Sequence, residues 1–191
     1  MPCIIIARTF LLDEGDRQLV TSPAFRLGNA QLRTAFVLSA PGKAECKAQR
    51  PAAGQTGITL TSALSTFHGA EPGIFPSLCL DDYTLVNAWD KVEYKARTGR
   101  TEATNAEILG VANICRLAQC FQYMDAIVAL GDKAQLAVDT AWPAGTIFTG
   151  DHPSLQRLNR AYRSCANAPS KRRIGRTRQW AICVLNSKRR R

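Results

Sequence analysis

Four short segments of the chain are almost continuously apolar and rich in β-branched or aromatic residues. They read TAFVLSA, YTLVNAW, DAIVALG and GTIFTG and occupy residues 34–40, 83–89, 125–131 and 145–150. Because their apolar residues are consecutive rather than alternating, the segments are typical of strands that are covered on both faces. The pattern therefore predicts four buried strands.

Helical spacing of apolar residues fills the intervals between these strands. In TNAEILGVANICRLAQCFQ, Thr104 and Glu107 have the spacing of a capping box, and apolar residues then recur with the period of a helix. The recurring positions are Ile108, Val111, Cys115, Ala118 and Phe121. We expect two further helices after the N-cap residues Asp132 and Ser154, and a shorter one over GITLTSALSTFHG that ends at Gly69.

Strands that alternate with helices predict an α/β fold, with three layers, α/β/α, and a central four-stranded, mainly parallel sheet. The length of 191 residues fits one domain over residues 1–191. Within it, residues 1–30 form an N-terminal extension that can add an edge strand or a hairpin. Residues 157–191 form a basic C-terminal segment.

The composition, 46% hydrophobic and 21% charged residues, is that of a globular protein. No apolar run approaches the roughly 20 residues that span a bilayer, so we expect no membrane partner. The first ten residues, MPCIIIARTF, are too short and too weakly basic at their start for a secretory signal. We therefore expect a cytoplasmic protein, and a monomer.

The seven cysteines are odd in number and scattered, which argues against a disulfide framework. A zinc site needs closely spaced ligands. The nearest cysteine pair is Cys115 and Cys120, with only His68 and His152 to complete a site. We expect reduced cysteines, no metal and no cofactor.

The positive charge of the chain is concentrated at its C-terminal end. Residues 157–191 hold twelve Lys or Arg and no acid, whereas the preceding residues are near neutral. We expect the last four residues to be a frayed, solvated tail. The segment as a whole favours a polyanion partner, because Lys and Arg that neutralise phosphates release counterions. Its densest cluster is Lys171, Arg172 and Arg173.

Residues suited to a binding or catalytic site follow the ends of the four predicted strands. They are SAPG after the first strand, Asn87 at the end of the second, LGD after the third and DHPS, with His152, after the fourth. Ligands of such sheets bind outside the carboxyl ends of the strands. Alone, His152 is more often a structural turn residue, and Asn87 a satisfied buried amide. Their shared edge favours a site.

Two common nucleotide-binding signatures do not occur. No Lys follows the glycines of PAAGQTGIT, as a P-loop requires. The H-x-E and P-C-x-x-C patterns of zinc nucleobase deaminases are also missing.

Four motifs, in order and at matching spacing, resemble the uracil-DNA glycosylase superfamily, especially its family-4-like branch. LSAPG followed by QRPAAGQTG resembles G-E-A-P-G followed by G-R-P-F-V-G-x-x-G, and YTLVNAW with TNAEI resembles Y-x-T-N-V-V with its T-x-x-E helix start. IVALG matches the third motif, and HPSLQR at residues 152–157 matches the last. The resemblance covers residues 34 to 160 and implies a base-flipping DNA glycosylase.

The sequence departs from this family at its iron–sulfur cluster and at its acids. Two of the four cluster cysteines would fall near Lys91 and Val111, so the resemblance implies no cluster here. The usual carboxylate positions hold Ser39, Ala40 and Gln55. The remaining acid of this loop, Glu45, is our candidate for directing water or stabilising the sugar cation.

The resemblance also implies roles for other residues. His152 would stabilise the departing base and Asn87 would read the pyrimidine edge. The aromatic residue that stacks on the base in relatives is replaced by Ala52, beside Ala53, which indicates either a wider pocket or an aromatic supplied by Phe67, Phe75 or Trp89. The expected base pocket consists of Ser39, Ala40, Pro41, Gly42, Ala52, Ala53 and Gln55. The expected DNA contacts are Gly57, Ser154, Leu155 as a wedge, Arg157, Lys171, Arg172 and Arg173.

We therefore expect a DNA glycosylase, acting on double- or single-stranded DNA near the nucleoid of a bacterium or phage host. Its substrate would be a modified pyrimidine, with a bulky cytosine such as glucosylated hydroxymethylcytosine first, as in the antiphage (Brig-type) branch of the superfamily. Uracil in base-excision repair is the enzymatic alternative. A non-catalytic DNA-binding module on a glycosylase scaffold is the third.

Overall fold

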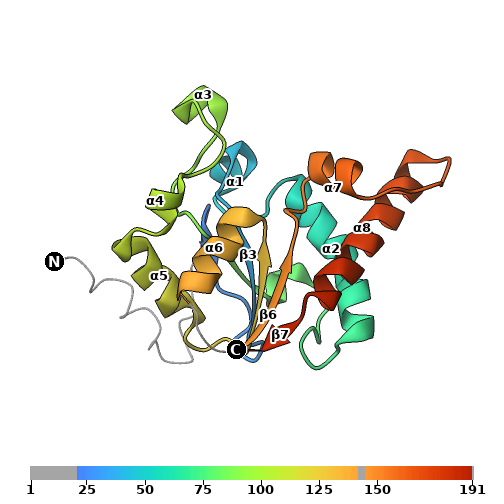
Figure 1. Ribbon diagram of the computed structural model, residues 1–191, viewed down its shortest axis with the longest axis horizontal. Coiled ribbons are helices and arrows are strands. Elements are labelled where there is room, and N and C mark those ends of the chain that lie inside the picture. The colour runs from blue at the N-terminus through green and yellow to red at the C-terminus, as the bar shows by residue number, and fades with distance from the viewer. Residues whose placement is uncertain (1–20, 142–144, 191) are drawn as a thin grey trace.

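The chain has an α/β fold, in which a mixed sheet carries helices on both faces (Figure 1). The computed structural model describes residues 21–141 and 145–190. The predicted α/β class is confirmed. In chain order, the elements are β1 (Thr21–Ser22), β2 (Phe25–Arg26), β3 (Thr34–Leu38), α1 (Lys43–Ala48), α2 (Gln55–Ala70), the 3₁₀ helix η2 (Leu80–Asp82), β4 (Thr84–Asn87), α3 (Lys95–Thr98), α4 (Asn105–Ile108), α5 (Val111–Phe121), β5 (Ala126–Leu130), α6 (Asp132–Ala141), β6 (Thr146–Gly150), α7 (Leu155–Ala161), α8 (Pro169–Asn186) and β7 (Arg189–Arg190).

The described residues form a seven-stranded sheet in the order β1-β2-β4-β3-β5-β6-β7. The predicted strands β3, β4, β5 and β6 pair in parallel with one another, whereas β1, β2 and β7 pair antiparallel at the two edges. The predicted number of strands, four, was therefore too small. The hairpin β1–β2 extends the sheet beside β4, as residues 1–30 suggested, and residues 1–20 lie outside the described part.

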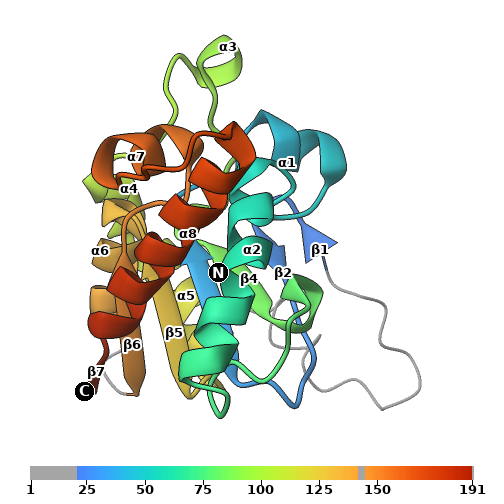
Figure 2. The same ribbon diagram turned by 90° about the vertical axis from the view of Figure 1, so that its right-hand side faces the viewer.

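The continuous apolar strands are explained by two hydrophobic clusters, one on each face of the sheet. Phe36 of β3 packs with α2 and α8, while the neighbouring Val37 packs with α5 and α6. Figure 2 faces the layer that α2 and α8 form. Because both faces are covered, every residue of β3, β4 and β5 is buried, and the strand pattern follows from this burial.

The helix expected from residue 104 is in fact two helices, α4 and α5. The capping box of Thr104 and Glu107 is confirmed, but the chain leaves helical geometry at Leu109 and Gly110. This break changes the face that α5 buries. Val111 is 80% exposed, and the predicted core positions Cys115 and Ala118 are exposed too. Ile108 and Phe121 are buried as expected, and Asn113 and Leu117 take the remaining core positions.

Two further expectations about the helices need correction. The helix after the first loop, α2, has sixteen residues and contains Gly69 rather than ending there. The basic C-terminal segment holds the eighteen-residue helix α8, whose buried stripe of Thr177, Trp180, Ala181 and Val184 packs on the sheet.

The expected frayed tail is also wrong for residues 188–190. Lys188 forms an ion pair with Glu71, Arg189 forms one with Asp139, and β7 pairs with β6. Arg191 lies outside the described residues. No helix in residues 21–141 and 145–190 is long and apolar enough to cross a membrane.

Candidate functional site

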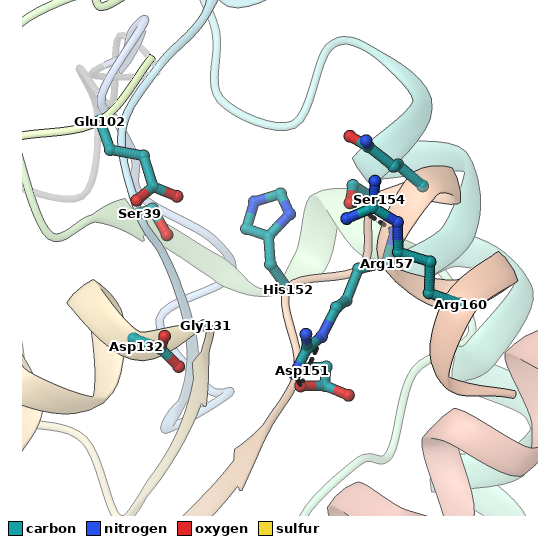
Figure 3. Close-up of a pocket in the computed structure, with 10 residues that line it drawn as sticks. Ser39, Glu102, Gly131, Asp132, Asp151, His152, Ser154, Arg157 and Arg160 are labelled. Carbon is teal, nitrogen blue, oxygen red and sulfur yellow. Dashed lines mark hydrogen bonds and ion pairs between the residues drawn. The ribbon is translucent and has the colours of Figure 1, made fainter. Parts of the chain in front are cut away.

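The loops that follow β3, β5 and β6 meet at the carboxyl edge of the sheet, as predicted. The pairing places Leu38 opposite Asn87 and Leu130 opposite Gly150, so the residues just after these strands share one edge. A cavity of about 250 Å³ opens there (Figure 3). Its lining consists of Ser39, Glu102, Gly131, Asp132, Asp151, His152, Ser154, Gln156, Arg157 and Arg160.

Gly131 allows the loops after β3, β5 and β6 to approach one another. Its φ of +96° is in the left-handed region, and a Cβ there would lie 3.1 Å from Ser39 Oγ and 3.2 Å from His152 Cβ. Only glycine combines this backbone conformation with so close an approach. Gly131 therefore brings Ser39 and His152 to the same wall of the cavity.

The His152 ring points into the cavity, with Glu102 and Ser39 on one side and α7 on the other (Figure 3). Burial lowers the pKa of His152 below its usual value of 6.5, although the charge of Glu45 opposes the shift. The ring is therefore neutral at pH 7. A neutral imidazole carries one N–H donor and one acceptor nitrogen.

Asp151 fixes the backbone immediately before His152. Its Oδ1 accepts hydrogen bonds from Arg157 Nε at 2.9 Å and Nη2 at 2.7 Å, and its Oδ2 accepts one from the Tyr162 hydroxyl at 3.4 Å. Its carbonyl oxygen accepts a 2.9 Å hydrogen bond from the indole of Trp180. Burial, together with the charge of Asp151, raises the pKa of Tyr162 to about 12. The predicted DNA contact Arg157 thus has an internal partner.

The DHPS segment leads into α7 as predicted. Ser154 is the N-cap, and its Oγ accepts a hydrogen bond from Arg157 N. The expected wedge, Leu155, is the first residue of α7 and is half-buried. One turn of the helix separates Gln156 from Arg160, and both line the cavity. Sequence reasoning missed this pair, although i, i+4 spacing places two residues on one helix face.

Two carboxylates of the cavity, Glu102 and Asp132, were also missed as site residues. Asp132 begins α6, where we expected only a helix cap. Glu102 lies in the loop between α3 and α4, fifteen residues after the end of β4. A search limited to the residues directly after each strand could not find it.

Glu45 is held at the start of α1, outside the lining of the cavity. Its Oε2 accepts a 3.0 Å hydrogen bond from Gly42 N in a capping arrangement. Its charge reaches His152, but its carboxylate is directed to the loop backbone. The neighbouring Pro41 is buried and Ala40 is half-buried against the α5–α6 cluster.

Asn87 ends β4 as expected, yet its amide is used within the fold. The residue is 1% exposed, and its Nδ2 donates to the carbonyl oxygens of Pro23 at 3.3 Å and Ala24 at 3.5 Å. The backbone carbonyl of Asn87 accepts from Arg116, whose pKa burial lowers. These contacts match a buried amide whose Nδ2 holds the segment between β1 and β2. Among the described residues, no hydrogen bond reaches its Oδ1.

The expected base pocket is divided between two places. Ala52 and Ala53 line a second cavity of about 630 Å³ between α2, η2 and β2, and this cavity shares no lining residue with that of His152. Ala52 is buried in the α2–α8 cluster with a φ of +51°. Of the seven predicted pocket residues, only Ser39 reaches the His152 cavity.

Gly57 and Gln55 also have local roles in this region. A Cβ on Gly57 would lie 1.9 Å from the carbonyl oxygen of Ala52, so packing alone accounts for this glycine. Gln55 begins α2, and its Nε2 is buried without a hydrogen bond to the described residues. The aromatic residues considered as replacements, Phe67 and Phe75, stack at 5.0 Å within the core. Trp89 donates to Glu93.

The α7–α8 arm, residues 155–178, carries cations at the same end of the molecule as the cavity (Figure 1). The side chains of Lys171 and Arg173 are exposed and form no hydrogen bond or ion pair with the described residues. Arg172 instead donates to the carbonyl oxygen of Asn167 at 2.7 Å. Lys171 and Arg173 are therefore available to bind phosphates, whereas Arg157 and Arg172 form hydrogen bonds within the protein.

The iron–sulfur cluster of the family-4-like branch does not fit the residues present. Lys91 and Val111 provide no thiolate at the corresponding positions. Within the part of the chain that the structure describes, no group of three or more His, Cys, Asp or Glu residues is arranged to hold a metal ion.

No protein-family model and no curated protein matches the sequence. Function therefore has to be argued from the geometry of the site.

Proposed function

We propose that the protein is a DNA glycosylase that hydrolyses the N-glycosidic bond of a modified pyrimidine and leaves an abasic site. One observation carries this proposal: a neutral histidine and carboxylates line a cavity at the carboxyl edge of a parallel sheet, beside a cationic arm. The motifs that resemble uracil-DNA glycosylases supply the residues Ser39, His152 and Ser154 of that cavity.

The chemistry would rest on His152. Cleavage of the sugar–base bond builds negative charge on the base and positive charge on the sugar. A neutral His152 can donate its N–H to a carbonyl oxygen of the departing base, and preorganised donors of this kind contribute most where water is excluded. Asp151, held by Arg157 and Trp180, keeps the ring in position for that contact.

A target base must leave the duplex before it can reach His152. In this proposal Lys171 and Arg173 bind phosphates, Leu155 enters the gap in the stack, and Arg160 contacts the backbone beside the flipped nucleotide. Ser154 at the start of α7 offers a further polar contact. Gly57, Arg157 and Arg172 remain predicted DNA contacts, with the internal roles described above.

The polar lining bears on the choice of base. Asp132, Gln156 and Arg160 would offer hydrogen-bond partners to the hydroxyl groups of a glucosylated hydroxymethylcytosine, and this base remains the substrate that we expect. The volume of about 250 Å³ favours the alternative, uracil, because it lies below the roughly 300–1,000 Å³ of typical ligand pockets. The position of Ala52 and Ala53 in another cavity removes their support for a widened pocket.

The test is to incubate the protein with uracil-containing, unmodified and glucosyl-hydroxymethylcytosine DNA and to quantify abasic sites. We expect abasic sites in the glucosylated DNA. Abasic sites in uracil DNA alone would show that the substrate is uracil, the alternative, and not the glucosylated base. Their absence from all three DNAs, with DNA binding retained, would leave the non-catalytic DNA-binding module.

Substitution of the histidine tests the mechanism separately. His152→Ala should lower the single-turnover rate by about 10²–10³-fold, the loss typical of one oxyanion-stabilising donor. The matched control is His68→Ala. His68 lies near the end of α2, outside the cavity, and its Nδ1 contacts the carbonyl oxygen of Phe75. Equal rates for His152→Ala and the parent protein would remove His152 from the chemistry.

A further inference from the structure

We infer that Glu102 is the catalytic carboxylate of this site, and that it deprotonates the attacking water in place of the acid whose position Ser39 occupies. Its side chain lines the cavity with Ser39 and His152, and it extends toward Ser39 from the loop between α3 and α4 (Figure 3). The inference rests on the proposed glycosylase function. It assigns the water-activating role to a residue more than sixty positions after Ser39.

The loop that carries Glu102 is fixed by an ion-pair network. Arg100 donates to Glu93 from Nε at 3.1 Å and from Nη2 at 2.6 Å, and to Glu107 from Nη1 at 2.7 Å and Nη2 at 2.8 Å. The Arg100 hydrogen bonds hold the pKa of both Glu93 and Glu107 at about 2, so both carboxylates stay charged. Planar, two-pronged pairs of this kind fix geometry as well as charge.

The two residues that follow Glu102 are held as well. Ala103 is buried in the α5–α6 cluster, and Thr104 caps α4 by accepting from Glu107 N. With Arg100 fixed on the other side, little backbone freedom remains at Glu102. The exposed Glu102 is therefore carried at the cavity by a restrained backbone, although the segment has no regular secondary structure.

The segment between β4 and α3 is joined to the first motif by backbone hydrogen bonds. Trp89 N donates to Ser39 O at 3.0 Å, and Glu93 N donates to Pro41 O at 2.9 Å. Glu93 is in turn the partner of Arg100. One continuous set of contacts thus runs from the Ser39 loop through Glu93 to Arg100, two residues before Glu102.

Two of the other carboxylates near the cavity are committed to other contacts. Glu45 caps Gly42 N, and Asp151 binds Arg157 and Tyr162. Asp132 begins α6 and, like Glu102, forms no hydrogen bond or ion pair with the described residues, so it is the rival acid of this cavity. Glu102 is exposed at the cavity and forms no hydrogen bond or ion pair with the described residues, which leaves both of its oxygens available for water.

The step balances without any other reactant. The C1′–N1 bond breaks and its electron pair leaves with the base, which His152 stabilises. Water forms the new O–C1′ bond and gives its proton to Glu102. That proton then passes to the departed base or to solvent, which regenerates the carboxylate.

The experiment compares single-turnover rates on whichever DNA yields abasic sites with the parent protein. Glu102→Gln should lower the rate about 10²-fold or more, the contribution typical of general base catalysis, while the Kd for DNA stays unchanged. Glu71→Gln is the matched control, because Glu71 ends α2 away from the cavity and pairs with Lys188. Glu45→Gln and Asp132→Asn test whether either of these two acids is the general base instead.

A structural role for Glu102 predicts a different set of results from a catalytic one. If Glu102 is the base, formate should restore part of the rate of Glu102→Ala, since a small carboxylate can occupy the vacated space. An active parent protein with unchanged rates in Glu102→Gln would overturn the inference, as would a larger loss in Glu45→Gln or Asp132→Asn. An inactive parent protein would instead count against the glycosylase function itself.

Discussion

At the residue scale, the lowered pKa of His152 has a consequence for stability. Its folded-state pKa lies below that of the unfolded chain, about 6.5, so the unfolded state binds more protons as the pH falls through 6.5. Stability is therefore lost toward lower pH. The loss approaches about 1.4 kcal/mol for each unit that separates the two pKa values.

This loss can be measured by urea unfolding between pH 7.5 and pH 5. The free energy of unfolding should fall more steeply toward acid in the parent protein than in His152→Gln. The window lies above the range in which Glu93 and Glu107, with pKa values of about 2 against the ordinary 4.5, begin to lose their own contribution. Parallel pH profiles for the two proteins would mean that His152 is not held neutral.

Individual site residues were predictable only where they lie just after a predicted strand. Ser39, His152 and Ser154 follow predicted strands, and all three line the cavity. Glu102 was not predictable, because its place depends on Arg100 bridging two acids that are fourteen residues apart.

At the scale of elements, strands were easier to predict than helices. The strands are buried on both faces, and continuous apolar runs record that burial directly. In α8 the cations of residues 171–178 obscured the stripe through Trp180 and Val184. In α5 the break at Gly110 shifted the buried face by a fraction of a turn, which no count of apolar spacing across the break could detect.

The start of α2 provides a stability test at this scale. Gly57→Ala should lower the free energy of unfolding by about 1–3 kcal/mol, because the new methyl group would overlap the carbonyl oxygen of Ala52 and force the backbone to shift. Gly69→Ala in the same helix meets no atom within 4 Å and should raise stability by about 0.4–1 kcal/mol. Urea denaturation measures both. A Gly57→Ala protein as stable as its parent would contradict the close packing of this loop.

At the scale of the whole molecule, the cations are divided between folding and binding. Lys188 and Arg189 close the end of the sheet through ion pairs with Glu71 and Asp139. Lys171 and Arg173 instead lie exposed in the first turns of α8. The net charge of +10 alone does not reveal this division.

The binding role of the arm predicts a change in salt dependence. Lys171→Ala with Arg173→Ala should weaken DNA binding and reduce the slope of log K against log salt by about 0.9 for each phosphate that is no longer neutralised. The comparison is Arg33→Ala, which removes an exposed cation, paired with Asp125, just before β3 at the opposite edge of the sheet. Slopes that change equally in both variants would show that binding follows net charge alone.

The most direct measurement of the central claim is the identity of what leaves the DNA. The parent protein is incubated with glucosyl-hydroxymethylcytosine DNA, and the small-molecule fraction is analysed by mass spectrometry beside uracil-containing and unmodified DNA. The account predicts release of the free modified base, with an intact backbone that alkali then cleaves at the abasic site. Binding of all three DNAs without release of any base would contradict it.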